Sequence, residues 1–183
     1  MFGRKDRSFF EEKILIHYGE IFKYAFAVTK DSHAAEDIAQ ETIEKAWSHL
    51  SQLRDRKKAK AWVFQIARNE IKHHFNDVNK RYKEYGVMPD KDLDLELHVD
   101  DPGEVFLEKM TMEEEKFLLG MAMEELPIQY REVLILWSQG EMSEKELSQV
   151  MDINYNTIRV HIHRGLKRLK EIYFSLEGGA QGE

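Results

Sequence analysis

The chain has 183 residues, of which 42% are hydrophobic, and a formal net charge of −7; this suits a folded protein with one medium-sized domain or two small ones. It contains no cysteine, which excludes disulfides, thiolate metal sites and cysteine nucleophiles. The first residues are polar, and no apolar run approaches the about 20 residues that cross a bilayer, so we expect a soluble, cytoplasmic protein with no membrane contact of its own.

The first part of the chain predicts three helices. Ser8 begins a capping-box spacing, and apolar residues then recur at helical intervals over residues 8–28. Asp31 or Ser32 can cap a second helix. After a polar, basic stretch, residues 62–75 repeat the helical pattern. Three such helices can close a bundle.

The middle of the chain is acidic and has no sustained period. Residues 84–116 hold twelve acidic and three basic residues. Residues 84–103 are therefore expected to be a linker. Residues 93–99 alternate in the manner of a strand, but a strand without a partner is disfavoured, and we expect an extended segment held by its leucines.

The last part predicts four helices. The first begins near residues 101–104, where a proline occupies the first helical position, and ends near Glu125. The second runs from Pro127 to Gly140. Ser143 and Glu146 have capping-box spacing and begin a short helix that ends at Met151. A long helix capped by Asn154 then reaches about Tyr173, and residues 176–183 are expected to be frayed.

The third and fourth of these helices, with a three-residue turn between them, predict a helix-turn-helix. Residues 153–170 contain five basic residues and no acidic one. A basic helix of this kind fits the major groove of DNA. Its outward-facing candidates are Asn156, Thr157, Arg159, Val160, His161, His163, Arg164 and Lys167.

The first part carries a second pattern. Asp37, Gln40, Glu41 and Glu44 lie near one polar face, which suits protein docking. Residues 54–83 then hold ten basic and three acidic residues, with aromatics nearby. Basic surfaces with aromatics suit single-stranded DNA. The charge distribution therefore favours a nucleic-acid binder although the total is acidic.

Three motifs carry a resemblance to a known family. Residues 35–42 (AEDIAQET), followed by KAW at 45–47, resemble the polymerase-binding helix of bacterial RNA polymerase sigma factors of the extracytoplasmic-function (ECF) type. Residues 61–69 (AWVFQIARN) are similar to their promoter-melting helix. Residues 126–134 and 143–169 resemble their domain for the minus-thirty-five element.

The resemblance implies a role for each surface. A set of polar residues would bind core RNA polymerase: Glu36, Asp37, Gln40, Glu41 and Glu44. Residues 48–58 would form a pocket for a flipped base. A second set would contact the minus-ten DNA and its melted strand: Ser51, Arg54, Lys57, Lys60, Asn69 and Lys72. The outward-facing residues of the last helix would lie in the minus-thirty-five groove, and the linker would follow the RNA path of the polymerase.

The resemblance also implies a domain plan and partners. The fold class is all-α, with two small helical domains joined by an acidic linker, the second a helix-turn-helix. We expect a core-binding and melting domain at 8–83, the linker at 84–103, the helix-turn-helix domain at 104–175 and a tail at 176–183. The partners are core RNA polymerase, promoter DNA and an anti-sigma factor. We expect a monomer when free, with no cofactor, no metal and no catalytic residue.

Three alternatives remain. A stand-alone helix-turn-helix transcription regulator with an N-terminal dimerisation or sensor domain would bind a palindromic site as a dimer. A metal enzyme is suggested by Glu70 and His73, a Glu-x-x-His unit of di-iron bundles. That chemistry needs a second copy, which the sequence lacks. A protein adaptor without DNA binding would leave the basic last helix unexplained.

Overall fold

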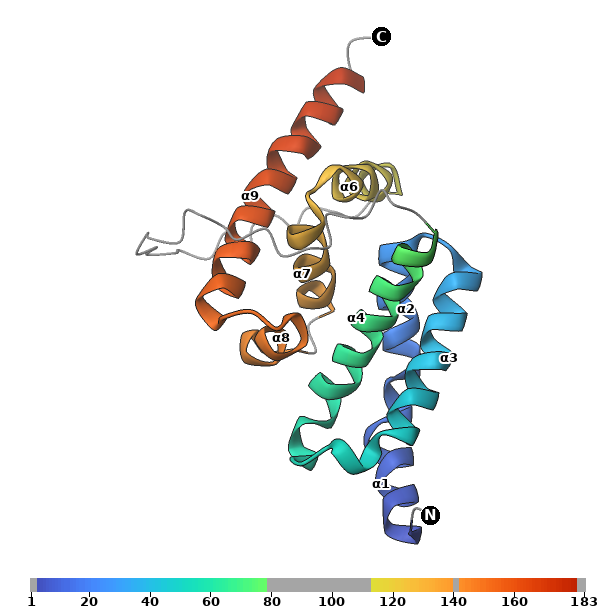
Figure 1. The fold of residues 1–183 in the computed structure, drawn as a ribbon. Helices are drawn as coiled ribbons and strands as arrows, with labels where there is room; N and C mark the ends of the chain where they lie inside the picture. Colours follow the sequence, from blue (N-terminus) through green and yellow to red (C-terminus); the bar gives the residue numbers. More distant parts are fainter. Residues whose placement is uncertain (1–2, 79–112, 140–141, 181–183) are drawn as a thin grey trace. The chain divides into compact units, whose positions relative to one another are not determined.

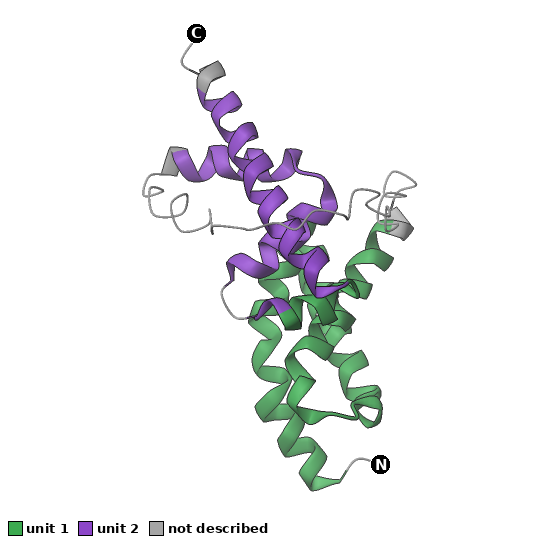
Figure 2. Cartoon of the chain, turned by 90° about the vertical axis from the view of Figure 1, so that its left-hand side faces the viewer, with its two compact units in different colours: residues 1–86, 145–153 green, residues 87–144, 154–183 purple. Residues whose placement is uncertain are grey.

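The structure is a computed structural model that describes residues 3–78, 113–139 and 142–180. Within these ranges every regular element is helical and no strand occurs, which confirms the all-α prediction (Figure 1). The chain divides into two compact units, residues 1–86 with 145–153 and residues 87–144 with 154–183 (Figure 2).

Unit 1 begins with two helices where the sequence predicted one. Helix α1 (Arg4–Lys13) is followed by the 3-10 turn η1 (Leu15–His17) and by α2 (Tyr18–Thr29). The cap predicted at Ser8 is wrong, because Gly3 occupies that position and its N–H donates to Asp6 Oδ2 at 3.3 Å. Ser8 instead lies inside α1 and donates to Glu12.

Helices α2, α3 (Ser32–Ser48) and α4 (Ala59–Val78) pack against each other, as predicted. Asp31 is the N-cap of α3 and accepts hydrogen bonds from the N–H groups of His33 and Ala34, at 2.9 and 3.1 Å. The bundle core contains Tyr24 and Phe64, both fully buried. Two 3-10 turns, η2 (Leu50–Gln52) and η3 (Arg56–Lys58), connect α3 to α4.

In unit 2, α6 (Glu113–Glu125) and α7 (Ile128–Ser138) pack on the long helix α9 (Tyr155–Ala180). Arg131 of α7 donates to the backbone oxygens of Glu124 and Leu126, which satisfies carbonyls at the end of α6. At Gly165 the helices α7 and α9 approach so closely that a Cβ atom there would lie 3.2 Å from Leu134 Cδ1. This glycine allows the close packing.

Helix α8 (Glu144–Met151) clusters with unit 1 and is joined to α9 by a turn. Asp152 in this turn adopts a left-handed conformation with φ 54°. Asn154 caps α9 as predicted, with its Oδ1 accepting from the N–H of Asn156 at 2.8 Å. The helix continues to Ala180, two turns beyond the predicted end near Tyr173, so that predicted helix end is wrong.

Several predictions lie outside the described residues. They are the acidic linker at 84–103, the extended segment at 93–99, the helix start at 101–104 and the helix end at Gly140. The predicted domain boundaries therefore stay predictions. Across the described ranges, no helix combines the length and the apolar character that spanning a bilayer requires.

Candidate functional site

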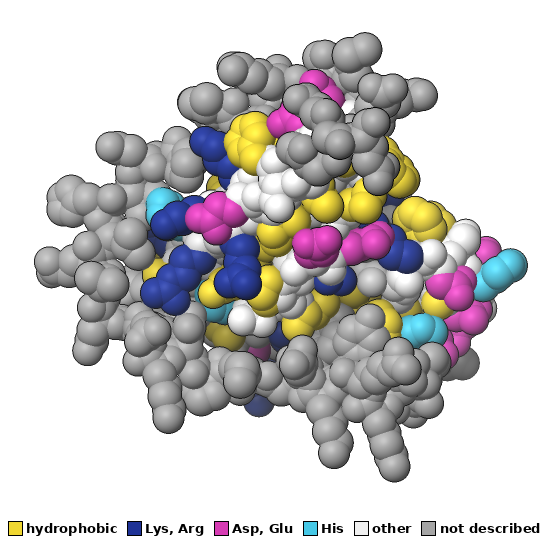
Figure 3. All heavy atoms as spheres, turned by 90° about the horizontal axis from the view of Figure 1, so that it is seen from above, with side chains coloured by type: hydrophobic (Ala, Val, Ile, Leu, Met, Phe, Trp, Pro, Cys, Tyr) yellow, Lys and Arg dark blue, Asp and Glu magenta, His cyan; other side chains and the backbone are white. Residues whose placement is uncertain are grey.

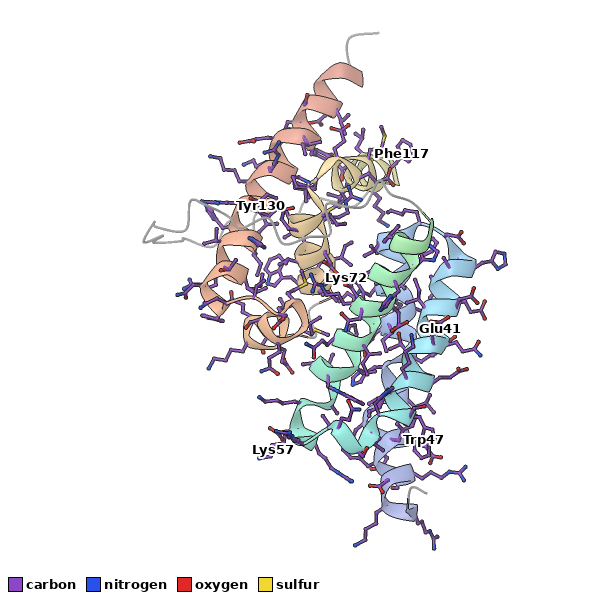
Figure 4. The ribbon with its side chains drawn as sticks, in the orientation of Figure 1. Glu41, Trp47, Lys57, Lys72, Phe117 and Tyr130 are labelled. Atoms are coloured by element: carbon purple, nitrogen blue, oxygen red, sulfur yellow. The ribbon has the colours of Figure 1, made fainter. Side chains whose placement is uncertain are left out.

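The polar face of α3 is exposed, as predicted. Glu36, Asp37, Gln40, Glu41 and Glu44 all lie in solvent, while Ala35, Ile38, Ala39, Thr42 and Ala46 on the other side of the helix are buried. Glu41 projects from α3 away from the bundle (Figure 4). The Gln40 amide donates to Glu44 Oε1 at 3.0 Å. We call these five exposed residues the acidic face.

A charge pair fixes α3 to α4 behind the acidic face. Lys45 Nζ contacts the carboxylate of Glu70, whose side chain is only 6% exposed, and lies 3.6 Å from Glu41 Oε2. The hydrogen bond with Glu70 is the main reason that the pKa of Lys45 is raised. The Glu70 of the Glu-x-x-His unit thus makes a contact between helices, while His73 is exposed.

The segment between α3 and α4 carries exposed basic side chains. Ser51, Arg54 and Lys57 are all exposed, and Lys57 lies in the segment just before α4 begins (Figure 4). The Asp55 carboxylate accepts from the Lys57 N–H at 3.0 Å and caps η3. We call residues 50–58 the basic loop.

A cavity of about 440 Å³ opens beside the basic loop within unit 1. Residues of the loop and of α4 form most of its lining, and one residue of α8 and one of the turn after it complete it: Gln52, Leu53, Arg54, Asp55, Lys58, Ala61, Trp62, Gln65, Gln149 and Asp152. Trp62 is partly exposed. An aromatic ring beside cationic side chains is the combination on which an unpaired base can stack.

The three expected melting residues of α4 differ in exposure. Asn69 is exposed and Lys72 is half-buried (Figure 4). Lys60 is only 19% exposed, and its Nζ lies 3.2 Å from Glu20 Oε2 of α2. Glu20 also contacts His17 Nδ1 at 3.1 Å. The charge of Lys60 is therefore engaged inside unit 1 in this structure.

Helix α9 exposes three of its eight predicted residues. Asn156, Arg159 and Lys167 are exposed, while Thr157, Val160, His163 and Arg164 are half-buried. Figure 3 shows Lys and Arg side chains, in dark blue, gathered on the left, on the side where α9 lies in Figure 1. The apolar side of the helix is buried at Ile158, Ile162, Leu166, Leu169 and Tyr173.

His161 was predicted to face outward, and this prediction is wrong. Its side chain is 8% exposed, and its ring meets Tyr130 of α7 edge-on, with 5.3 Å between centroids. The close approach of α7 at Gly165, one turn later, brings His161 into the packed side of α9. Gly165, four residues after His161, was the sequence signal for this close packing of α7 on α9.

Arg159 has a partner that the sequence analysis missed. Its Nε lies 3.9 Å from Glu144 Oε2. The same carboxylate accepts a hydrogen bond from the Tyr155 hydroxyl, which raises the pKa of Tyr155. Glu144 therefore contacts two side chains of the first turns of α9.

Two protein families match separate parts of this chain. The Sigma-70 region 2 family matches residues 14–81, and the Sigma-70 region 4 family matches residues 116–169. The ECF RNA polymerase sigma factor SigM of Bacillus subtilis (strain 168) is 32% identical over 164 residues, which cover 89% of this chain and 94% of SigM.

The chain belongs to the ECF RNA polymerase sigma factors. As a sigma factor it recognises promoter DNA and takes part in transcription initiation with RNA polymerase. The region 2 match covers the acidic face, the basic loop and α4, and the region 4 match covers α7, α8 and most of α9. Helix α1 precedes the first match, which begins at residue 14.

Two solved structures share the fold of this sigma factor. One is the sigma factor RpoE in complex with the anti-sigma factor NepR from Bartonella quintana, with a TM-score of 0.65, 22% identity and coverage of 89% of this chain and 95% of that chain. The other is CnrH in complex with the cytosolic domain of CnrY, with a TM-score of 0.63, 17% identity and coverage of 91% and 88%.

The relatives of this sigma factor are named as sigma factors, which are transcription factors and not enzymes. Among the residues that the structure describes, no group of three or more His, Asp or Glu side chains is arranged to hold a metal ion.

Proposed function

We propose that this sigma factor uses three of its surfaces, each for a different contact in the promoter complex. The acidic face of α3 binds core RNA polymerase. The basic loop, with Asn69, Lys72 and Lys60 of α4, takes the minus-ten element and its melted strand. The outward side of α9 lies in the major groove of the minus-thirty-five element.

The observation that carries the first assignment is the exposure of all five polar residues on one side of α3. The buried alanines and Ile38 on the opposite side fix the rotation of the helix, and the Lys45–Glu70 contact holds it on α4. A rigid surface of one charge sign suits docking to a basic protein surface, because complementary charge speeds association and fixes the register.

The second and third assignments are supported by charge and exposure. Arg54 and Lys57 can neutralise phosphates, and Trp62 borders the cavity beside them. On α9, Arg159 and Arg164 have the chemistry to grip guanine edges, while Lys167 suits a phosphate. Without His161, the base contacts fall to Asn156, Thr157, Arg159, Val160, His163 and Arg164.

We further propose that the protein acts in the cytoplasm, has no catalytic activity of its own and is a monomer when free. The two solved neighbours, RpoE and CnrH, are each held by a partner, NepR and the cytosolic domain of CnrY. We infer that an anti-sigma factor likewise holds this chain inactive. Recovery of the chain from its native cell with polymerase alone would contradict this.

Charge reversal of the acidic face tests the proposal. Asp37→Lys with Glu41→Lys should reduce affinity for core polymerase by about tenfold or more, because two attractive contacts become repulsive. The matched control is Glu12→Lys, an exposed acid of α1 outside the face. Binding is measured in a pull-down with purified core polymerase. Equal affinity of the two variants would refute the assignment.

A further inference from the structure

Helix α1 lies ahead of the family match, yet it contacts the segment proposed to recognise the minus-ten element. Asp6 Oδ1 accepts a hydrogen bond from Arg56 Nη2 at 2.5 Å. The Arg56 guanidinium also lies over the Phe9 ring, 4.5 Å from its centroid. One side chain of the basic loop is therefore bound twice by α1.

A third contact fixes α1 itself at this position. Phe10 is buried, and its ring meets Trp47 of α3 edge-on with 4.9 Å between centroids. Trp47 lies near the end of α3, just before the basic loop begins (Figure 4). The side chains of Asp6, Phe9 and Phe10 thus connect α1 to the end of α3 and to the middle of the α3–α4 connection.

The basic loop has few means of holding its own shape. Its two regular pieces, η2 and η3, are three residues long each, and 3-10 turns of this length have weak hydrogen-bond geometry. Asp55 fixes the start of η3 from within. The contacts of Arg56 join η3 to α1, in addition to the contacts that η3 makes with α4.

We propose that α1 sets the orientation of the basic loop, with Asp6, Phe9 and Arg56 as positioning residues for minus-ten recognition. This rests on the proposed role of the loop. Because Arg56 is directed to α1 and its charge is matched by Asp6, its neighbours Arg54 and Lys57 are the residues turned to DNA. On this proposal the four basic residues at positions 54–58 do not share one role.

The test uses the full chain with core polymerase on promoters that carry a matched or a substituted minus-ten element. Asp6→Ala removes the ion pair with Arg56 together with the hydrogen bond from the Gly3 N–H, and Phe9→Leu removes only the ring contact and keeps an apolar side chain. We expect each variant to lower the preference for the matched element about three- to tenfold. This factor corresponds to the interaction energy of a partly shielded ion pair or cation–π contact. Affinity for core polymerase should not change.

Two further variants sharpen the result. Arg7→Ala removes the ion pair of Arg7 with Glu11, which lies on the same helix and is exposed, and should leave the preference as it is. Combining Asp6→Arg with Arg56→Asp restores an ion pair without the ring contact, so part of the lost preference should return relative to Asp6→Arg alone.

Three results would overturn the proposal. One is an unchanged preference in both Asp6→Ala and Phe9→Leu. Another is a loss that is equal on every minus-ten sequence and follows a lower melting temperature, since α1 would then only stabilise the bundle. The third is a loss in Arg56→Ala without any in Asp6→Ala, which would make Arg56 a direct DNA contact. If Arg54→Ala and Lys57→Ala also had no effect, the proposed role of the loop itself would fail.

Discussion

The outer sides of α3 and α9 hold their functional side chains in different ways. On α3, all five residues of the acidic face are exposed, and the helix is anchored from behind by Lys45 and Glu70. On α9, only three of the eight predicted residues are exposed, four are half-buried, and His161 is buried against Tyr130. Arg159 is also paired with Glu144.

The width of the buried sector on each helix, and not the number of packing partners, accounts for part of this difference, because α3 and α9 each pack against two helices. Helix α9 is covered by α6 and by α7, and the approach at Gly165 widens its buried sector. Helix α3 has small buried residues that confine its contacts to one side. When only a narrow sector of a helix is buried, its whole polar face stays exposed and can contact a partner. A face on a more enclosed helix has fewer positions from which to read DNA.

Removing the anchor of α3 should have the largest effect on stability. Lys45→Ala leaves the Glu70 carboxylate buried without this cation. We expect a loss of about 2–3 kcal/mol in the free energy of unfolding, toward the low end for broken buried pairs because Lys45 itself is half-exposed. Urea denaturation measures it, and Lys23→Ala, an exposed lysine of α2, is the control. Equal midpoints would show that the pair does not anchor α3.

Crowding the α7–α9 contact should have the next largest effect. Gly165→Val adds a branched side chain where even a Cβ would lie 3.2 Å from Leu134 and Tyr130. We expect a loss of about 1–2 kcal/mol from overpacking, reduced by the better helix propensity of valine. Gly120→Ala in α6, where a Cβ would meet nothing within 4 Å, should instead stabilise. A stabilised Gly165→Val variant would remove the explanation for the burial of His161.

Arg159 tests whether α9 reads bases through the side chains that remain outward. Arg159→Ala should cost about 1 kcal/mol of affinity at the minus-thirty-five element, with most of the loss at one base pair, while Lys167→Ala should weaken all sequences alike. Holoenzyme binding to a panel of substituted elements measures both. A uniform loss for Arg159→Ala would assign this residue to phosphate contact.

The smallest effect concerns the cap of α3 at low pH. Two backbone N–H groups, of Ala34 and His33, hold the pKa of Asp31 below its ordinary value of 3.8. The ionised cap therefore stabilises α3 above that value, and this contribution disappears as the pH falls through the lowered pKa. Asp31→Asn, which can cap without titrating, should flatten the melting temperature against pH below about 4. Parallel curves for the two proteins would contradict this.

The sequence was sufficient where local chemistry decides the structure. Asp31 and Asn154 cap their helices through hydrogen bonds to nearby backbone, and the spacing of small apolar residues defined the acidic face. The predicted cap at Ser8 failed because an earlier cap, at Gly3 with Asp6, was also available. The break at η1 between α1 and α2 was hidden by apolar residues that continue the helical spacing through it.

Contacts between distant segments could not be predicted from pattern. The outward prediction for His161 assumed that α9 is buried along one narrow stripe, and α7 widens that stripe. Arg56 and Lys60 had the same basic character as their neighbours, but Asp6 and Glu20, 50 and 40 positions earlier, engage them. The pairing of Arg159 with Glu144 likewise depends on the turn between the two helices.

Run-off transcription with purified core polymerase on a promoter library tests the account most directly. The account predicts that the chain joins the core and starts transcripts from one class of promoters, which the core alone does not use. The contradicting result is a chain that does not associate with the core but binds a symmetric operator unaided, as a dimer.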